Sequence, residues 1–196
     1  MPPSLPPITT LPSLPETTQT QVLDTLFESS KDLHTIALPL LAHQTFSSYP
    51  SLINAVGARM TALSAANSSQ DRKILHGILG AHPRLGEKKQ ASLSELSRQE
   101  QAGLNAGAGE EGKKAQDENV RKKAEEEAAE LKRLNDEYEE KFTGLRYVVF
   151  VNGRRREVII QDIRRRIDRG DIEKEKEEII QAMCDIAIDR AQMLQS

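Results

Sequence analysis

The sequence predicts an all-α protein, a single-domain helical bundle with one long charged helix. Its 196 residues are enough for one domain with a buried core. Hydrophobic residues make up 37% of the chain but aromatic residues only 4%, so aliphatic side chains must build most of that core. Along most of the chain, apolar residues recur every three or four positions, as on the buried face of a helix, and short polar links separate these runs.

Residues 1–15 are expected to form a proline-rich arm ahead of the domain, which is expected over residues 16–196. The arm holds six of the nine prolines, each of which fixes its own backbone and lacks an N–H donor. We therefore expect an extended segment there rather than a helix.

Four helices are expected after the arm. The first follows a threonine-rich stretch able to cap it, and the others are expected over residues 31–45, 51–63 and 69–80, with Pro39 breaking or kinking the second. The apolar positions that predict them are Val22, Leu23, Leu26, Phe27, Leu52, Val56, Met60, Ile74, Leu75, Ile78 and Leu79.

A long charged helix is expected over residues 113–141, after a helix over residues 92–104 and a glycine-rich link. Acidic and basic residues alternate in it at helical spacing, which favours a solvated helix that protrudes from the body and is held by i,i+4 ion pairs. The alternative is a coiled coil that binds a partner, although the apolar positions are too few for a sustained heptad seam.

The C-terminal third is expected to hold an extended link and two helices. Residues 147–151 form a single β-like run, which cannot make a sheet alone, and Asn152-Gly153 then turns the chain. Isoleucines at i+4 spacing predict an arginine-rich helix around residues 159–167, and a last helix is expected over residues 171–194. The inner side of that last helix is expected to present Ile172, Ile179, Ile180, Met183, Ile186, Ala187 and Met193.

The charge balance disfavours nucleic acid as a partner. Lys and Arg number 27 against 30 Asp and Glu, a formal net charge of -3, whereas polyanion-binding domains are usually basic. The arginine runs 154–156 and 164–166 could form a nucleic-acid patch, but the neighbouring Asp162, Asp168 and Asp171 favour a salt-bridged face.

The composition predicts a cytoplasmic or peroxisomal protein without a membrane partner. Cys184 is the only cysteine, so no intrachain disulfide can form, and its apolar neighbours indicate a core position. No apolar run approaches the roughly 20 residues of a membrane span. The N-terminus lacks the order of a signal peptide, and the C-terminus is not a peroxisomal Ser-Lys-Leu tail. No Cys or His spacing indicates zinc.

His82 is the histidine with the most unusual setting. Pro83 disfavours helical backbone at His82, so the preceding helix should end there. A histidine at that end faces the negative end of the helix dipole, which favours its protonated form. A purely structural His-Pro helix end is the alternative.

A second polar cluster follows at Ser97, Glu100 and Gln101. Adjacent residues of a helix point about 100° apart, so at most one edge each of Glu100 and Gln101 can serve one pocket. A carboxylate that reached His82 would keep it charged and oriented. Glu87 is an alternative partner, and a plain surface pair is the alternative for Glu100 and Gln101.

These two segments belong to a longer series of motifs that runs along the chain after the arm. The motifs, in chain order, are Leu26-Phe27-Glu28, Ala81-His82-Pro83-x-Leu85-Gly86, Ser97-x-x-Glu100-Gln101, Leu134-Asn135-x-x-Tyr138-x-x-x-Phe142, Val148 to Val151 and Gly153-Arg154. In this order they resemble the 2-oxo-4-hydroxy-4-carboxy-5-ureidoimidazoline (OHCU) decarboxylases over nearly the whole chain after the arm. The charged stretch after Gly112 resembles an insertion relative to that family.

The resemblance implies an all-α, usually dimeric enzyme without metal or organic cofactor that converts OHCU to (S)-allantoin and CO2 in urate breakdown. It implies His82 as the catalytic residue, and we expect Glu100 to maintain its charge state. We expect Arg154 to bind the substrate carboxylate. The implied substrate-binding residues are Pro83, Ser97, Gln101, Tyr147, Val148, Val149, Phe150 and Val151.

A non-catalytic helical protein that binds a partner through residues 113–141 is the alternative function. A decayed pocket should have lost its polar residues, whereas His82, Ser97, Glu100 and Gln101 all remain. This favours the enzyme.

Overall fold

The computed structural model describes residues 4–86, residue 96 and residues 118–195. This part of the chain is helical and contains no strand, which confirms the predicted all-α class. The chain divides into two compact units, one formed by residues 1–82 with 176–196 and the other by residues 83–175. No helix among the described residues is both long and apolar enough to cross a membrane.

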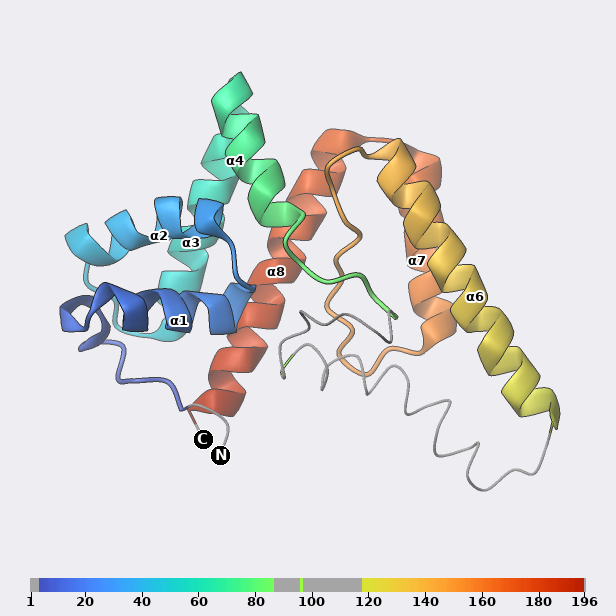
Figure 1. Ribbon diagram of the computed structural model, residues 1–196, viewed down its shortest axis with the longest axis horizontal. Coiled ribbons are helices and arrows are strands. Elements are labelled where there is room, and N and C mark those ends of the chain that lie inside the picture. The colour runs from blue at the N-terminus through green and yellow to red at the C-terminus, as the bar shows by residue number, and fades with distance from the viewer. Residues whose placement is uncertain (1–3, 87–95, 97–117, 196) are drawn as a thin grey trace. The chain divides into compact units, whose positions relative to one another are not determined.

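The first unit is built on four helices that follow the predicted ranges closely (Figure 1). Helix α2 packs against α1, α3 and α4, and α3 packs against α4. Most of the last helix also belongs to this unit. The elements are the 3-10 helix η1 Leu11–Ser13, α1 Glu16–Phe27, α2 Lys31–His43, α3 Tyr49–Ala66, α4 Ser69–Leu79 and α8 Ile172–Leu194.

Serine side chains begin three of these helices. Ser30, Ser48 and Ser68 each accept a hydrogen bond from a backbone N–H in the first turn of the helix that follows. The threonine-rich stretch, in contrast, does not cap α1. The helix begins at Glu16, before the threonines, so its N-cap is Pro15, whose side chain makes no cap hydrogen bond. The threonines lie within the first turns of the helix instead. Pro39 lies within α2, which continues through it.

The described part of the proline-rich arm, residues 4–15, belongs to the first unit rather than forming an extended lead. Ile8 and Leu11 are buried, and Leu11 begins η1. The Tyr49 hydroxyl also donates to the Pro6 carbonyl at 2.8 Å. Prolines prevent an α-helix here, but burial of the apolar side chains between them still contributes favourable free energy to folding.

Cys184 lies in the core of the first unit, as expected from its apolar neighbours. It is 7% exposed, and burial raises the pKa of its thiol to about 11. The nearby backbone of Gly57 is so close that an added Cβ would lie 2.7 Å from Cys184 Sγ. The thiol is therefore a protonated packing group.

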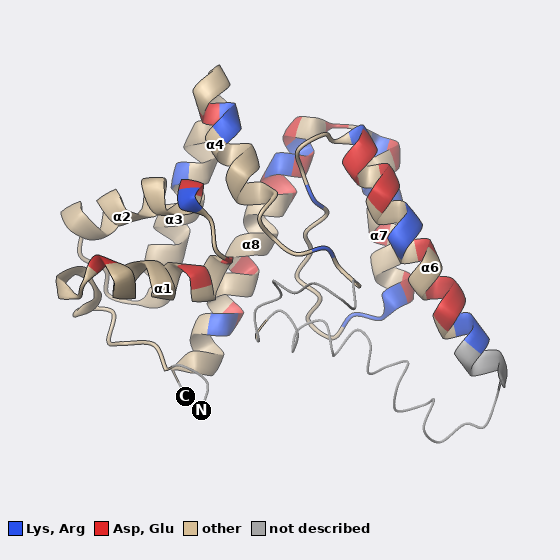
Figure 2. Cartoon of the chain, viewed as in Figure 1, with Lys and Arg blue, Asp and Glu red and all other residues tan. Residues whose placement is uncertain are grey.

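The second unit contains α6 Glu118–Lys141, which packs against α7 Arg156–Arg169. Charged residues gather on these two helices, whereas α1, α2 and α3 are mostly uncharged (Figure 2). Ion pairs at i,i+4 link Lys132 to Asp136 and Arg133 to Glu137, as expected for a solvated charged helix. Part of α6 nevertheless belongs to the core, because its four apolar positions form one helical face. These buried residues are Leu131, Leu134, Tyr138 and, just past its end, Phe142.

The last two helices confirm the predicted ranges, with two corrections at the ends of α8. Ile172 is 38% exposed and Met193 is 48% exposed, although the helical pattern placed both on the inner side. Each lies in a terminal turn of α8, where fewer neighbours can cover a side chain.

The arginine-rich helix α7 is salt-bridged, as its acidic neighbours indicated. Arg165 pairs with Asp162 at 2.7 Å, and Arg164 pairs with Glu130 of α6. Arg166 is buried and contacts Glu175 at 2.8 Å. These pairings neutralise the second arginine run within the second unit.

Candidate active site

His82 follows the end of α4 in the first unit. The helix ends at Leu79, and the backbone N–H groups of Gly80 and Ala81 donate to the carbonyls of His76 and Ile78. His82 itself is 9% exposed. The predicted helix end before the His-Pro pair is therefore confirmed, and the imidazole is largely removed from solvent.

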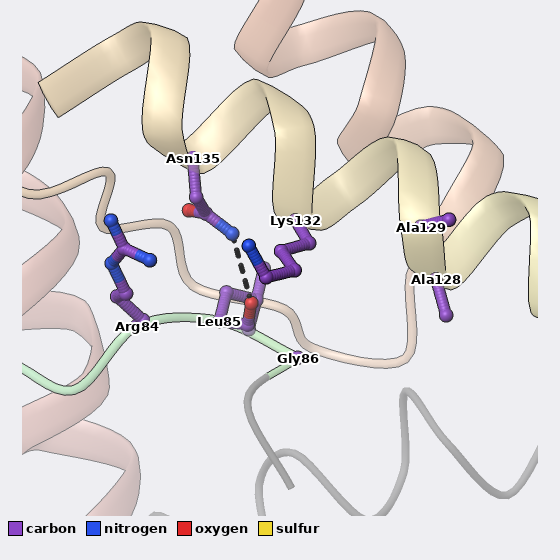
Figure 3. A pocket seen from close by; sticks show the side chains of 7 residues that line it. All are labelled: Arg84, Leu85, Gly86, Ala128, Ala129, Lys132 and Asn135. Atoms are coloured by element: carbon purple, nitrogen blue, oxygen red, sulfur yellow. Dashed lines mark hydrogen bonds between the residues drawn. The ribbon is translucent and has the colours of Figure 1, made fainter. Parts of the chain in front are cut away.

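The loop that continues from His82 belongs to the second unit and is fixed to α6 (Figure 3). Arg84 donates to both carboxylate oxygens of Glu139, at 2.7 and 2.8 Å, and pairs with Asp136 at 2.9 Å. The Asn135 amide donates to the Leu85 carbonyl at 3.1 Å. These bonds hold Arg84 and Leu85, the two residues that follow Pro83, against α6.

Gly86 ends the described part of this loop and is expected to tolerate no side chain. Its φ is +83°, and an added Cβ would lie 2.8 Å from Leu131 Cδ2. We expect Gly86→Ala to lower the free energy of unfolding by about 1–3 kcal/mol, measured by urea denaturation. Gly153→Ala is the matched control, because Gly153 also has positive φ but has nothing within 4 Å of an added Cβ. Equal losses in the two variants would contradict the packing argument.

A cavity of about 320 Å³ lies between this loop and α6 (Figure 3). Its polar side chains already have partners within the second unit, including Lys132 with Asp136 and Arg84 with Glu139. Among the described residues, none of the predicted site residues lines it. The lining residues are Arg84, Leu85, Gly86, Ala128, Ala129, Lys132 and Asn135. We therefore do not assign the cavity as the active site.

The predicted extended link is confirmed in the second unit. Residues 145–151 connect α6 to α7 without helix or strand (Figure 1). Tyr147, Val148 and Val151 are buried, whereas Val149 and Phe150 are half-buried. Because the described residues contain no strand that could pair with the link, side chains must fix its backbone there.

The expected turn at Asn152-Gly153 closes the link. Both residues have positive φ, and the Arg154 N–H donates to the Val151 carbonyl at 2.8 Å, as in a type I′ turn. The Arg154 guanidinium also donates to the carbonyls of Phe150 and Val151. Arg154 is exposed and folds back along the link.

Asp162 anchors the start of the link. The Tyr147 hydroxyl donates to one of its oxygens at 2.7 Å, and Arg165 donates to the other at 2.7 Å. Burial alone would raise the pKa of Asp162, but the hydrogen bonds from Arg165 and Tyr147 outweigh it and hold that pKa below its usual value. Burial raises the pKa of Tyr147 well above its ordinary value, so its hydroxyl remains a donor.

A lowered carboxyl pKa gives Asp162 a pH-dependent stabilising role. The contribution is fully present above the unfolded-state pKa, about 3.9, and is lost as the pH falls through the lower folded-state value. We expect Asp162→Asn to cost about 1–3 kcal/mol at pH 7, with the gap from wild type narrowing below about pH 4. Urea denaturation at several pH values measures both. A gap that stays constant down to pH 3 would contradict this role.

Comparison with known protein families decides the identity. The family model of OHCU decarboxylase matches residues 12–192 of the chain, a range that covers the second compact unit and most of the first. The chain belongs to the OHCU decarboxylase family. It is therefore a decarboxylase, a carboxy-lyase of purine and urate breakdown that acts on a small molecule. A search of curated proteins found no match.

The family's predicted site residues fall in different parts of the chain. His82 belongs to the first unit, and the second unit contains Pro83, the link residues 147–151 and Arg154. Ser97, Glu100, Gln101 and the alternative partner Glu87 lie outside the described residues, as does nearly all of the predicted helix over residues 92–104.

The buried charges of this decarboxylase were not predicted from the sequence. Arg166, Glu175 and Arg190 are at most 2% exposed, and each pairs with an opposite charge. The signal was present in the helical pattern. Arg166 shares a face with Ile163, and Arg190 lies four residues after Ile186. A charge within an apolar stripe predicts a buried partner.

Proposed function

We propose that this decarboxylase converts OHCU to (S)-allantoin and CO2 without a metal or organic cofactor. The supporting observation is family membership over nearly the whole chain, together with the family histidine retained as His82 in a largely buried position. Burial limits competing proton exchange with water at the reacting carbon.

The chemistry requires little beyond orientation, charge stabilisation and one proton. The bond from the ring carbon to the carboxylate breaks, CO2 leaves, and the electron pair is delocalised into the imidazoline ring. The electron pair enters the ring carbon–nitrogen double bond, so a ring nitrogen takes up one proton and the carbon that lost CO2 becomes part of an enol. A proton then adds to the neighbouring carbon, which bears the ureido group, while the enol hydroxyl gives up its proton and becomes the carbonyl of allantoin. The protein must therefore hold the carboxylate, stabilise the developing charge and supply the proton to one face.

We assign this proton transfer to His82. In this proposal Glu100 keeps the imidazole charged and oriented, while Ser97 and Gln101 bind polar edges of the substrate. Pro83 lines the site beside His82. These assignments follow the family motifs at the matching positions of this chain.

The link residues 147–151 are proposed to bind the urea-like edges of the substrate through backbone N–H and C=O groups. This role suits a segment without a sheet, since its backbone groups are not consumed by strand pairing. We propose that Arg154 binds the substrate carboxylate, a task that suits the planar guanidinium. To do so it would exchange its bonds to the Phe150 and Val151 carbonyls.

The interaction-protein alternative draws no support from α6. Its charged side chains are largely engaged within the second unit, for example Lys123 with Glu157 at 2.5 Å and Arg133 with Glu130 at 2.9 Å. Its apolar face is buried in the same unit. A helix whose charges and apolar face are both occupied offers little to a partner.

Substrate decay tests the proposal. OHCU generated from urate in situ is followed by its ultraviolet absorbance with and without the protein, and CO2 release is measured in parallel. We expect the rate of OHCU decay to rise in proportion to protein concentration, with one CO2 released per OHCU consumed. The faster decay should persist after the protein is dialysed against a chelator. Decay at the uncatalysed rate would refute the proposed activity, and loss of activity after chelation would refute its independence of metal.

We also propose a homodimer in the cytoplasm or peroxisome. This assembly is characteristic of the family, and the chain has only one cysteine, which is consistent with a reducing compartment. Sedimentation equilibrium of the full chain tests the assembly directly. A monomer at micromolar concentration would contradict it.

A further inference from the structure

A network of buried polar groups surrounds the start of the link in the second unit. Arg166 is 2% exposed, and Glu175, Tyr138 and Tyr147 are also buried. Burying charged groups costs several kcal/mol for each ion unless geometry and hydrogen bonding offset it. Replacing a buried ion pair by apolar residues of similar volume is often neutral for stability. These buried charges therefore have a role beyond packing, and the groups that they contact indicate which role it is.

Arg166 joins the link to the helices. Its Nη1 donates to the Val148 carbonyl at 3.1 Å, and its Nε donates to Glu175 at 2.8 Å. The guanidinium carbon also lies 4.9 Å from the centre of the Tyr147 ring, within the range of a cation–π interaction. One side chain thus holds both the backbone and a side chain of the link.

Glu175 in turn fixes Arg166. Its Oε2 accepts from the Tyr138 hydroxyl at 2.6 Å, and its other oxygen accepts from Arg169. Burial raises the pKa of Tyr138 well above its ordinary value, so this hydroxyl remains a donor. Tyr138 of α6 and Glu175 of α8 therefore hold the Arg166 guanidinium in the position from which it contacts the link.

The hydrogen bond from Arg166 to the Val148 carbonyl fixes part of the link backbone. No strand in the described part of the chain pairs with the Val148 carbonyl, and Arg166 supplies the donor that a sheet would otherwise provide. Fixing this carbonyl also fixes the neighbouring backbone at Val149 and Phe150, the two half-buried residues of the link.

We propose that Arg166 is a positioning residue of the decarboxylase, which sets the link backbone that binds the substrate and thereby selects the face that receives the proton. The inference rests on the proposed function. Arg166 is buried and acts through the Val148 carbonyl, so it is not a catalytic residue.

The test compares Arg166→Lys and Arg166→Met with wild type. Lysine keeps the charge but lacks the planar fork that reaches two acceptors at once, and it remains informative if the methionine variant does not fold. Arg164→Met is the matched control, since Arg164 lies on the same helix but is exposed and pairs with Glu130. The readouts are kcat, KM, the enantiomeric excess of allantoin and hydrogen exchange of residues 147–151.

We expect kcat/KM of Arg166→Lys to fall by about ten- to a hundredfold, with a lower enantiomeric excess. We also expect exchange in the link to be about tenfold faster while α6 and α7 remain protected. Arg164→Met should match wild type. A purely structural role would lower the melting temperature but leave KM, enantiomeric excess and link exchange unchanged, which would overturn the proposal.

The exchange measurement separates this inference from the proposed activity. If wild type did not turn over OHCU, the proposed function would fail and the catalytic part of the inference with it. If wild type were active but Arg166→Lys showed unchanged link exchange and enantiomeric excess, only the positioning role would fail.

Discussion

Replacing His82 with alanine is expected to lower stereoselective turnover by about 10²–10⁴-fold, the usual contribution of a general acid. The imidazole is the group we assign to proton delivery, and alanine cannot replace it. The fold should persist, because His82 lies beyond the end of α4 and the last turn of that helix is capped by backbone bonds. Initial rates and far-ultraviolet circular dichroism measure the two effects.

His43→Ala provides the control for that variant. His43 is the last residue of α2 and is exposed, so its loss removes an imidazole without disturbing the proposed site. We expect its rate and product to match those of wild type. A folded His82→Ala variant with the wild-type rate would remove His82 from the mechanism, whatever the activity of the protein.

The largest expected effect on stability belongs to Arg190. Its guanidinium is fully buried in the first unit and donates to Glu28 at 2.7 Å. It also donates to the carbonyls of Thr25 and Leu26 at 3.1 and 3.3 Å, where the end of α1 leaves carbonyls without helical partners. The cation thus completes both a buried ion pair and a helix C-terminus.

Arg190→Met is expected to lower the free energy of unfolding by about 3–5 kcal/mol, because it leaves the Glu28 carboxylate buried without its countercharge. Adding Glu28→Gln should restore part of that loss, since the remaining group is then neutral. Urea denaturation of the two single variants and the double variant measures the coupling. Additive losses would show that the two side chains do not act as a pair.

Most helices could be predicted from the sequence because an amphipathic helix repeats its apolar residues every three or four positions. The ranges around α3 and α4 were correct to within a few residues. The charged helix was predicted only in part. Its many Glu and Lys residues concealed that Leu131, Leu134 and Tyr138 form one face, so its burial in the second unit was not expected.

The buried charges could not be predicted with their partners. Arg166 and Glu175 are nine residues apart, and Arg190 pairs with Glu28 from the other end of the chain. Sequence shows that a charge interrupts an apolar stripe, but the partner depends on which helices pack together. The extended link was predictable because one β-like run without a second cannot form a sheet.

The stereochemistry of the product tests the central claim most directly. OHCU is generated from urate in the presence of the protein, and circular dichroism follows the allantoin formed, since spontaneous decay gives a racemate with no signal. We predict rapid growth of the signal of the (S)-enantiomer at a rate proportional to protein concentration. A racemic time course that is unchanged by well-folded protein would contradict enzyme-controlled protonation and with it the proposed function.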